Sequence, residues 1–303
     1  MTEAIDAGGL AVIIPTRDRW AILRRTLDAL RDQTVTGFET VVVVDGDEHA
    51  PSEIEGVRLL RKEHGGPGVA RNFGVEHTDT PLLMFLGDDM VPEPRLIERH
   101  LAAHATHPDT ADAVIGHVTW HPEIHRDRLL RWLDWSGTQF DFVNIVGNDA
   151  GWGRFYSCNV SLKRELFTAA GAFDPAFTYY YEDLDLAWRL RERGLRLHYE
   201  RDARTQHLHP YSWSRLEGRF RGIAEGERMM AEKHDWFEPF FAGRIDEAMK
   251  VHRRSRVWPL IVDAVPRRLP RARAAAERRA DTWYYQQLAP AFRSVWDGHV
   301  PAR

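Results

Sequence analysis

Apolar runs alternate with helical segments over the first part of this 303-residue chain. Residues 10–14, 38–44 and 82–86 are apolar and rich in branched side chains, a composition typical of strands buried on both faces. The intervening segments 20–30 and 69–77 predict helices, the first because its apolar side chains recur at helical spacing. Strands that alternate with helices predict an α/β domain with a mostly parallel sheet flanked by helices.

Acidic residues stand at the carboxyl ends of two of these predicted strands. Asp45 follows the second run, and Asp88 and Asp89 follow the third directly after Gly87. Ligands of open α/β sheets bind in the crevice beyond the carboxyl ends of the strands. Because a glycine lets the backbone turn sharply, both carboxylates can face that crevice, one binding a hard cation and the other a hydroxyl group. The placement favours a Mg²⁺ or Mn²⁺ site over a solvated turn.

The bulk composition excludes several other classes of protein. The single cysteine, Cys158, rules out an intramolecular disulfide framework and a cysteine-rich zinc site. A formal net charge of −4 gives no overall attraction for nucleic acid. The N-terminus lacks the basic and then apolar pattern of a signal peptide, and no apolar run reaches the ~20 residues of a membrane helix. We therefore expect a cytoplasmic protein.

The remainder of the chain is mixed up to His209 and helical beyond Pro210. The mixed part predicts a helix over 96–105, a strand over 113–120, an irregular stretch over 132–158, a helix over 182–194 and short strands over 195–199 and 205–209.

A second acidic cluster opens the predicted helix at 182–194. Three tyrosines at 179–181 precede Glu182 and Asp183. Acids in a first helical turn complement the helix macrodipole, which explains them without a function. A carboxylate beside an aromatic, partly dry pocket can equally act as a general base for a hydroxyl group. Both interpretations remain open from these residues alone.

Two histidine pairs have different prospects as metal ligands. His207 and His209 share one face of a predicted strand, so either could complete an octahedral metal site, or one could be packed and the other solvated. His100 and His104 lie one helical turn apart, but no HExxH glutamate lies between them, which disfavours zinc.

The glycine-rich loop at 64–68 leads into a predicted helix. It lacks the ending of a P-loop and the spacing of a dinucleotide fold. A glycine loop that opens a helix can still receive a phosphate group, with Arg71 nearby as its charge partner.

Residues 252–279 carry nine arginines against two acids, beside apolar residues. A solvated helical face would account for them. The alternative is peripheral contact with an anionic membrane, where a lipid-linked acceptor would lie.

Six segments resemble motifs of the glycosyltransferase family 2 enzymes and follow one another in the same order as in that family. These enzymes are metal-dependent and have the Rossmann-like GT-A fold. The resemblance runs from about Leu10 to His209, about two thirds of the chain. The segments are AVIIPTRDR and VVVVDG as the first two strands, GVARNFG as the GxxxARN helix, FLGDDMVP as the metal-binding DxD segment, FDPAFTYYYEDLDLAWRLRERG as the ED motif, and ARTQHLH as the strand that supplies a histidine.

The resemblance implies roles for ten residues and an organisation of the chain. It implies a GT-A domain over 1–209, with a nucleotide-binding half over 8–92 and an acceptor half over 93–209, and a helical C-terminal region over 210–303. The implied roles are base and ribose contacts for Pro15, Thr16, Arg17 and Asp45 with Arg71 close by, a ribose contact for Asp88, a metal ligand in Asp89, the catalytic base in Asp183, its acceptor-positioning neighbour in Glu182, and a further metal or diphosphate ligand in His207.

The implied activity is inverting transfer of a sugar from a nucleotide-diphosphate sugar, with Mn²⁺ or Mg²⁺ assisting the leaving diphosphate. The acceptor would be a hydroxyl of a glycan, a lipid-linked molecule or a small molecule. Because the QxxRW motif of processive synthases is absent, we expect addition of a single sugar. The chain departs from the family at Gly87, where many relatives have a first aspartate, and after Asp45, where a serine is often found.

Two other functions fit parts of the pattern. A sugar-nucleotide pyrophosphorylase is also a metal-dependent α/β nucleotide binder, but it would need a glycine-rich signature loop after the first strand, and PTRDR has no glycine. A non-catalytic carbohydrate-binding protein would not need both acidic pairs, Asp88-Asp89 and Glu182-Asp183.

Overall fold

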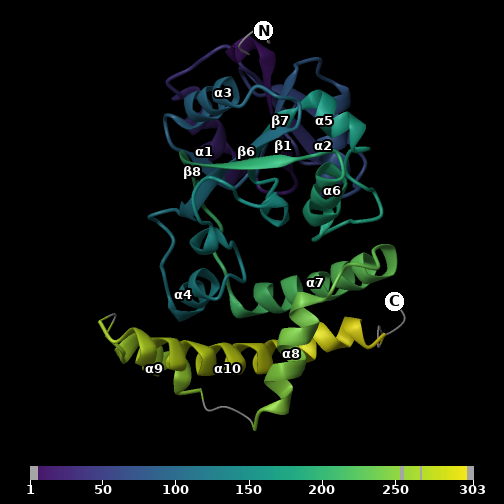
Figure 1. Cartoon of the computed structure of the whole chain (residues 1–303). Coiled ribbons are helices and arrows are strands. Elements are labelled where there is room, and N and C mark those ends of the chain that lie inside the picture. Colours follow the sequence, from purple (N-terminus) through teal and green to yellow (C-terminus); the bar gives the residue numbers. More distant parts are fainter. Residues whose placement is uncertain (1–5, 253–255, 267, 299–303) are drawn as a thin grey trace. The chain divides into compact units, whose positions relative to one another are not determined.

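The computed structural model describes residues 6–252, 256–266 and 268–298. The chain forms two compact units, one within residues 1–125 and 141–210 and the other within residues 126–140 and 211–303. The first unit is α/β and the second is helical (Figure 1).

The first unit is built on an eight-stranded sheet in the order β3-β2-β1-β4-β7-β6-β8-β5. The pairs β1–β2, β1–β4, β2–β3 and β6–β8 are parallel, and the pairs of β7 with β4 and β6 and of β5 with β8 are antiparallel. The predicted mostly parallel sheet is confirmed. The strands are β1 (Leu10–Thr16), β2 (Glu39–Asp45), β3 (Arg58–Lys62), β4 (Leu82–Leu86), β5 (Met90–Pro92), β6 (Asp112–Trp120), β7 (Asn159–Lys163) and β8 (Arg196–His207).

Five α-helices flank this sheet (Figure 1). The close approach of one of them follows from a glycine, because a Cβ at Gly74 would lie 2.6 Å from Ile13 Cγ2. Because Gly74 has no side chain, α2 can pack closely against β1. This packing brings Arg71, one turn earlier, toward the strand ends. The helices are α1 (Trp20–Arg31), α2 (Pro67–Glu76), α3 (Leu96–Thr106), α5 (Arg164–Ala169) and α6 (Glu182–Arg191), with 3₁₀ turns at Ala7–Gly9, Phe142–Asn144 and Trp152–Arg154.

One strand replaces the two short strands predicted over 195–199 and 205–209. Strand β6 pairs with β8 along its whole length, from Asp112 opposite Arg196 to Trp120 opposite His207. A register shift between Gly116 and His117 absorbs the extra residues of β8 as a bulge. The prediction was wrong because polar residues in the bulge interrupt the apolar pattern without ending the pairing.

In the described part of the chain, the second unit has five helices, and segment 126–140 belongs to it. The stretch predicted to be irregular over 132–158 begins inside one of these helices, α4, whose Trp132 is fully buried. Trp132 Nε1 donates to Asp281 Oδ1 at 2.9 Å, and its ring stacks on Tyr284 at 4.4 Å. The helices are α4 (Arg128–Trp135), α7 (Trp213–Lys233), α8 (Phe240–Lys250), α9 (Trp258–Ala264) and α10 (Pro270–Trp296).

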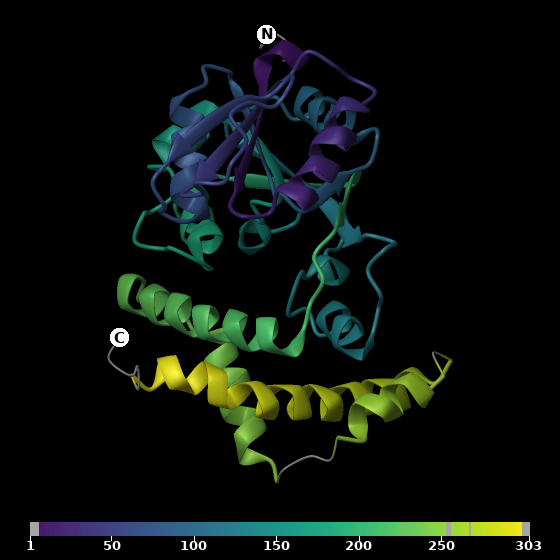
Figure 2. The same ribbon diagram turned by 180° about the vertical axis from the view of Figure 1, so that it is seen from behind.

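Helix α10 organises this unit, because it contacts α7, α8 and α9 (Figure 2). The predicted boundary at residue 209 assigned segment 126–140 to the first unit, whereas the packing of Trp132 joins it to the second. Among the described helices, none combines the length and the apolar character that a membrane crossing requires.

Candidate active site at the strand ends

Asp88 and Asp89 occupy the turn between β4 and β5, where Met90 N donates to Gly87 O at 3.2 Å. Since β1 and β4 are parallel neighbours, their carboxyl ends meet at the same edge, and Thr16 Oγ1 donates to Asp88 Oδ2 at 2.8 Å. The main chain is also fixed, because Thr26 Oγ1 donates to Asp88 O at 2.9 Å. The turn therefore directs both carboxylates to the edge where α/β sheets bind ligands.

Asp89 lies against two histidines from the end of β8. The antiparallel pairing of β5 with β8 sets Met90 opposite His207. His207 Nε2 lies 3.2 Å and His209 Nδ1 3.3 Å from Asp89 Oδ2. These three ligand atoms lie within 4.8 Å of one another. A carboxylate and two imidazoles form a ligand set that suits a first-row divalent cation.

Arg19 connects the two carboxylates. Its Nη1 forms an ion pair with Asp88 Oδ1 at 3.1 Å, and its Nη2 forms another with Asp89 Oδ2. Arg19 follows the carboxyl end of β1, so the same strand-end rule that selected Asp45 and Asp88 could have selected it from the sequence. The guanidinium provides the positive charge that two buried adjacent carboxylates need.

The two carboxylates respond differently to this environment. Burial and the neighbouring Asp89 charge raise the pKa of Asp88 well above its ordinary value, against the opposing effect of Arg19. Burial alone would also raise the pKa of Asp89, but the charge and hydrogen bond of His207, with His209 and Arg19, hold it well below its ordinary value. Asp89 is therefore the carboxylate that stays charged and can hold a cation.

Glu182 and Asp183 open helix α6 after two residues in the left-handed region, Tyr180 (φ 61°) and Tyr181 (φ 68°). Such backbone is strained for a bulky side chain and is concentrated at functional sites. Asp183 Oδ2 accepts a bond from Ser157 N at 3.0 Å. Asp183 Oδ1 is buried and has no hydrogen-bond partner in the part of the chain that the structure describes. An unpaired carboxylate oxygen at a helix start is available for a ligand proton.

Glu182 is buried and faces Arg71 from α2, with Oε1 3.4 Å from Arg71 Nη1. Burial and the adjacent Asp183 charge raise the pKa of Glu182 well above its ordinary value, while Arg71 opposes the shift. Arg71 also lies over the Phe173 ring, 5.4 Å from its centroid, and its Nε has no partner among the described residues.

Cys158 joins the two acidic clusters. Its carbonyl oxygen accepts a bond from Gly87 N at 3.2 Å, and the preceding Ser157 binds Asp183. Burial raises the pKa of the Cys158 thiol, and the charges of Asp183 and Asp89 add to the shift. The side chain of Cys158 also lies close to the aspartate turn, because a Cβ at Gly87 would be 3.7 Å from Cys158 Cβ. Periodicity could not have predicted this junction, because β7 enters the sheet between strands distant in sequence.

Groups of the chain itself occupy both oxygens of the Asp45 carboxylate. Its carboxylate accepts bonds from Lys62 Nζ at 3.0 Å, from Gly65 N and Gly66 N at 2.9 Å each, and contacts His64 Nδ1 at 2.8 Å. Asp45 thus anchors the glycine-rich loop at the head of α2.

The other expected nucleotide contacts lie at the end of β1. Pro15 is half-buried, whereas Arg17 is exposed and pairs with Asp18 at 3.7 Å.

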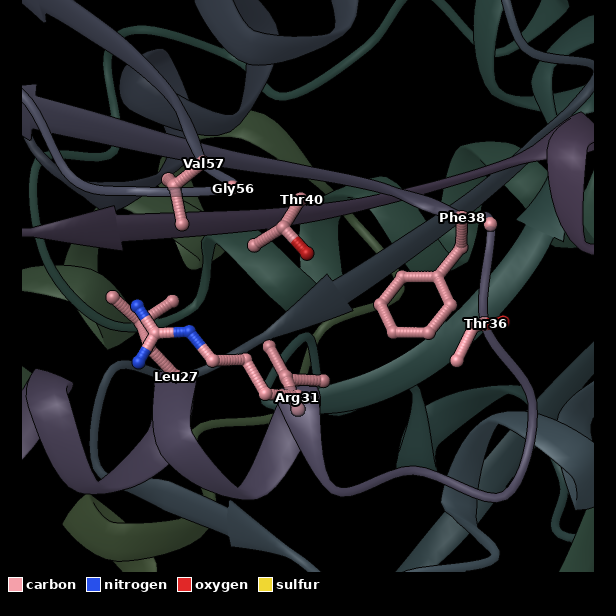
Figure 3. Close-up of a pocket in the computed structure, with 9 residues that line it drawn as sticks. Leu27, Arg31, Thr36, Phe38, Thr40, Gly56 and Val57 are labelled. Carbon is pink, nitrogen blue, oxygen red and sulfur yellow. The ribbon is translucent and has the colours of Figure 1, made fainter.

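His100 and His104 lie in a buried polar network between α3 and β7. Both contact Ser161 Oγ, at 2.7 and 2.8 Å, and His104 Nδ1 also lies 2.8 Å from Lys163 Nζ. These contacts explain the pair as packed core histidines. A separate hollow of about 160 Å³ between α1 and β2, lined by Leu27, Phe38 and Val57 among others, contains none of the candidate site residues (Figure 3).

The fold and the strand-end site define an α/β protein with a carboxylate–histidine cluster and a second carboxylate pair. The sequence profile of the family described as glycosyl transferase family 2 matches residues 11–168. The chain belongs to that family, whose members transfer glycosyl groups.

Curated relatives agree with this assignment. The chain is 30% identical over 231 residues to the validoxylamine A glucosyltransferase of Streptomyces hygroscopicus subsp. jinggangensis, covering 64% of this chain and 54% of that protein. It is 30% identical over 217 residues to the pre-mycofactocin glycosyltransferase of Mycobacterium tuberculosis, covering 66% and 43% respectively. The chain spans about half the length of these curated relatives.

Solved structures share the GT-A fold. A mannosyltransferase from Pyrobaculum calidifontis in complex with GDP-Man and Mn²⁺ matches with a TM-score of 0.57 at 17% identity, covering 95% of this chain and 87% of that one. GalNAc-T7 with UDP, GalNAc and Mn²⁺ matches with a TM-score of 0.52 at 15% identity, covering 71% and 47%. The predicted family and fold are confirmed.

Proposed function

We propose that this protein transfers a single sugar from a nucleotide-diphosphate sugar to an acceptor hydroxyl, with inversion at the anomeric carbon. One observation carries the proposal. Two carboxylate clusters nearly a hundred residues apart in sequence are joined by the adjacent residues Ser157 and Cys158, since Ser157 N donates to Asp183 Oδ2 and Cys158 O accepts a bond from Gly87 N. Asp183 Oδ1 has no hydrogen-bond partner among the described residues. A direct displacement needs this division of labour, with cation binding at one cluster and proton removal at the other.

The donor's diphosphate would bind beside Asp89 and His207, with His209 as a further candidate ligand. The Asp89 carboxylate suits Mn²⁺ or Mg²⁺, and the two imidazole donors favour Mn²⁺ over the harder Mg²⁺; two structural neighbours were solved with Mn²⁺. Bound there, the cation would neutralise the charge that develops on the leaving diphosphate. Asp88, held by Thr16, would bind the ribose.

The remaining donor contacts would come from the end of β1 and from α2. Pro15, Thr16 and Arg17 would line the base and ribose, and Asp45 would act by holding the glycine-rich loop in place. Arg71 has a buried Nε without a partner in the described chain, which suits an anionic ligand.

Asp183 would be the general base. Ser157 N–H holds its Oδ2, so Oδ1 would accept the proton of the acceptor hydroxyl. The acceptor oxygen then forms its bond to the anomeric carbon as the bond from that carbon to the diphosphate oxygen breaks, and the nucleoside diphosphate leaves with the electron pair. Glu182, fixed by Arg71, would position the acceptor.

The test is a panel of UDP-, GDP- and dTDP-sugars incubated with the purified chain, with and without Mn²⁺ or Mg²⁺. We expect cation-dependent release of a nucleoside diphosphate from at least one donor. Formation of a nucleoside triphosphate from pyrophosphate and the donor would instead indicate a pyrophosphorylase. Sugar binding without release would indicate a carbohydrate-binding protein, and no binding or release with any donor would reject the transferase.

We also propose that the helical unit binds anionic lipid, so that the acceptor is approached from a membrane surface. Val257, which directly precedes α9, and Leu260 within it are 43% and 46% exposed, and the exposed Arg256 precedes Val257. Residues 253–255 and 267 of the predicted arginine-rich stretch lie outside the described residues. Apolar side chains beside a basic one suit the inner face of a cytoplasmic membrane. Co-sedimentation with phosphatidylglycerol vesicles, but not with phosphatidylcholine vesicles, is expected, and Leu260→Asp should abolish it. Equal recovery with both vesicles would reject the contact.

A further inference from the structure

We propose that Arg19 holds the place of the divalent cation in the unloaded chain and yields it on loading, so that cation and donor bind cooperatively. The inference rests on the cation site of the proposed function and gives Arg19 a role beyond charge balance. It follows from which atoms the guanidinium contacts.

A single nitrogen of Arg19 contacts two of the three candidate ligand atoms. Nη2 pairs with Asp89 Oδ2 and lies 3.2 Å from His209 Nδ1. The same oxygen, Asp89 Oδ2, lies 3.2 Å from His207 Nε2. A cation such as Mg²⁺ sits about 2.0–2.1 Å from its oxygen ligands. It would therefore occupy space that Nη2 fills, and the two positive groups exclude each other.

The chain has a reason to keep a cation of its own at this position. Asp88 and Asp89 are 6% and 8% exposed, and adjacent buried carboxylates without a counter-charge are costly. Arg19 contacts both of them and supplies that charge without any ligand. A divalent cation arriving alone must first displace this pair, so its affinity is reduced by the strength of the Arg19 contacts.

The donor changes this competition. The Arg19 side chain is 32% exposed, so it can move toward solvent when displaced. A guanidinium binds phosphate oxygens readily, and the donor's diphosphate offers such oxygens beside the same carboxylates. The diphosphate thus gives the displaced guanidinium a new anionic partner. Because coupling between two ligands is reciprocal, the cation must strengthen donor binding by the same factor.

Arg25 supplies a matched control. It lies on α1, six residues after Arg19, and carries the same charge. Its side chain is 44% exposed, and its ion pair is to Glu123 at 2.8 Å rather than to either site carboxylate. Removal of Arg25 changes the net charge as much as removal of Arg19 does, but it leaves the ligand atoms as they are.

The experiment measures Mn²⁺ binding to the full chain by titration calorimetry, alone and with saturating UDP or GDP, so that no turnover is involved. For the wild type we expect weak binding alone and a gain of about tenfold or more with the nucleoside diphosphate that binds. Arg19→Ala should bind Mn²⁺ alone about tenfold more tightly than the wild type, and its gain with nucleotide should fall below about threefold. Arg25→Ala should behave as the wild type does.

Arg19→Lys keeps a charge but loses the forked geometry, so it should fall between the wild type and Arg19→Ala, and it replaces Arg19→Ala in the comparison if that variant does not fold. Mn²⁺ binding by Arg19→Ala, or by Arg19→Lys in its place, that is no tighter than the wild type would overturn the inference, as would an undiminished gain with nucleotide. The Mn²⁺-only comparison does not depend on any sugar donor. A chain that releases no nucleotide from any donor but gains Mn²⁺ affinity in Arg19→Ala would separate failure of the proposed function from failure of this inference.

Discussion

The α/β unit has two clusters of aspartate, histidine and arginine, at opposite ends of the paired strands β6 and β8. One lies where Trp120 pairs with His207, and it includes Asp89, His209 and Arg19. The other lies at the start of the same strands, where Asp112 pairs with Arg196, and includes His107 and His198. Residue types alone would give both clusters the same interpretation.

The clusters differ in how the chain balances their charges. Asp112 Oδ1 accepts a bond from Arg196 Nε at 2.7 Å and contacts His198 Nε2 at 2.8 Å, and its Oδ2 accepts a bond from Asp109 N at 3.1 Å. Burial alone would raise the pKa of Asp112, but Arg196 and His198 lower it well below its ordinary value.

At the candidate active site, His207, His209 and Arg19 likewise lower the pKa of Asp89. The difference is a second buried carboxylate, because Asp88 shares Arg19 with Asp89 and its pKa is raised. A cluster that is satisfied within the chain stabilises the fold, whereas one left short of positive charge suits a ligand that supplies it.

The largest expected effect comes from replacing one aspartate in each cluster with asparagine. Asp89→Asn should lower sugar transfer by about a thousandfold, because the loss of a charged cation ligand removes several kcal/mol of transition-state stabilisation. Asp112→Asn should leave transfer by the folded protein within about twofold of the wild type but lower the free energy of unfolding by about 2 kcal/mol, since bonds to a charged group are lost. Initial rates and urea unfolding of both variants measure the two effects.

The comparison fails if the variants behave alike. Asp89→Asn should keep its unfolding free energy within about 1 kcal/mol of the wild type, because relief of the repulsion with Asp88 offsets the lost contacts. Loss of transfer in Asp112→Asn at full folding would assign a ligand role to the second cluster as well.

The next effect isolates the proposed base. Asp183→Asn preserves the size of the side chain and an oxygen for the Ser157 N–H bond, but it removes the proton acceptor. We expect transfer to fall by at least about a hundredfold while donor and Mn²⁺ affinity stay within about twofold. Separate binding titrations and rate measurements distinguish the two outcomes, and transfer at the wild-type rate would remove Asp183 from the mechanism.

The sequence predicted the parts of this site that depend on local pattern. Asp88 and Asp89 follow a buried strand, and the rule for ligands at strand ends locates them from the sequence alone. The same rule could have located Arg19, but its contacts with Asp89 across 70 residues and with His209 across 190 are encoded by no periodicity. The same limit hid Cys158, which lies between the acidic clusters because β7 inserts antiparallel next to β4.

The fold was predictable to a similar depth. Strands and helices up to Leu86 follow from apolar runs and helical spacing, and they lie close to where the sequence placed them. Segment 126–140 belongs to the second unit because Trp132 packs against a helix about 150 residues later in the chain, where it donates a hydrogen bond to Asp281. Tertiary packing of this kind is not contained in a local pattern.

A smaller effect concerns the pH dependence of the free energy of unfolding, and it tests the buried histidine His100. Burial lowers the pKa of His100 to about 4 from its ordinary 6.5, so between these values the unfolded chain binds a proton that the folded chain does not. Stability is therefore present above pH 6.5 and lost as the pH falls toward 4, with a slope of up to about 1.4 kcal/mol per pH unit from this group. Urea unfolding of the wild type and His100→Gln across this range measures the difference in slope.

His100→Gln should have the shallower dependence, even though the loss of contacts to Ser161 and Asn159 lowers its stability at every pH. The exposed His125→Gln is the control for removal of a histidine. Parallel curves for the wild type and His100→Gln would show that this buried imidazole does not titrate between the two pH values.

The smallest effect concerns Gly87, the residue that precedes the two site carboxylates. A Cβ there would lie 3.0 Å from both Asp89 Oδ1 and Met90 Cγ, so the side chain of Asp89 must shift by a few tenths of an ångström to admit it. Gly87→Ala should lower the unfolding free energy by less than about 1 kcal/mol. It should weaken Mn²⁺ binding by about threefold, because the moved atom belongs to a candidate ligand. Gly153→Ala, where a Cβ would meet nothing within 4 Å, is the control. Unchanged Mn²⁺ affinity in Gly87→Ala would mean that the absence of a side chain at residue 87 does not determine the position of the Asp89 carboxylate. In that case, a side chain at residue 87 is compatible with the candidate cation site.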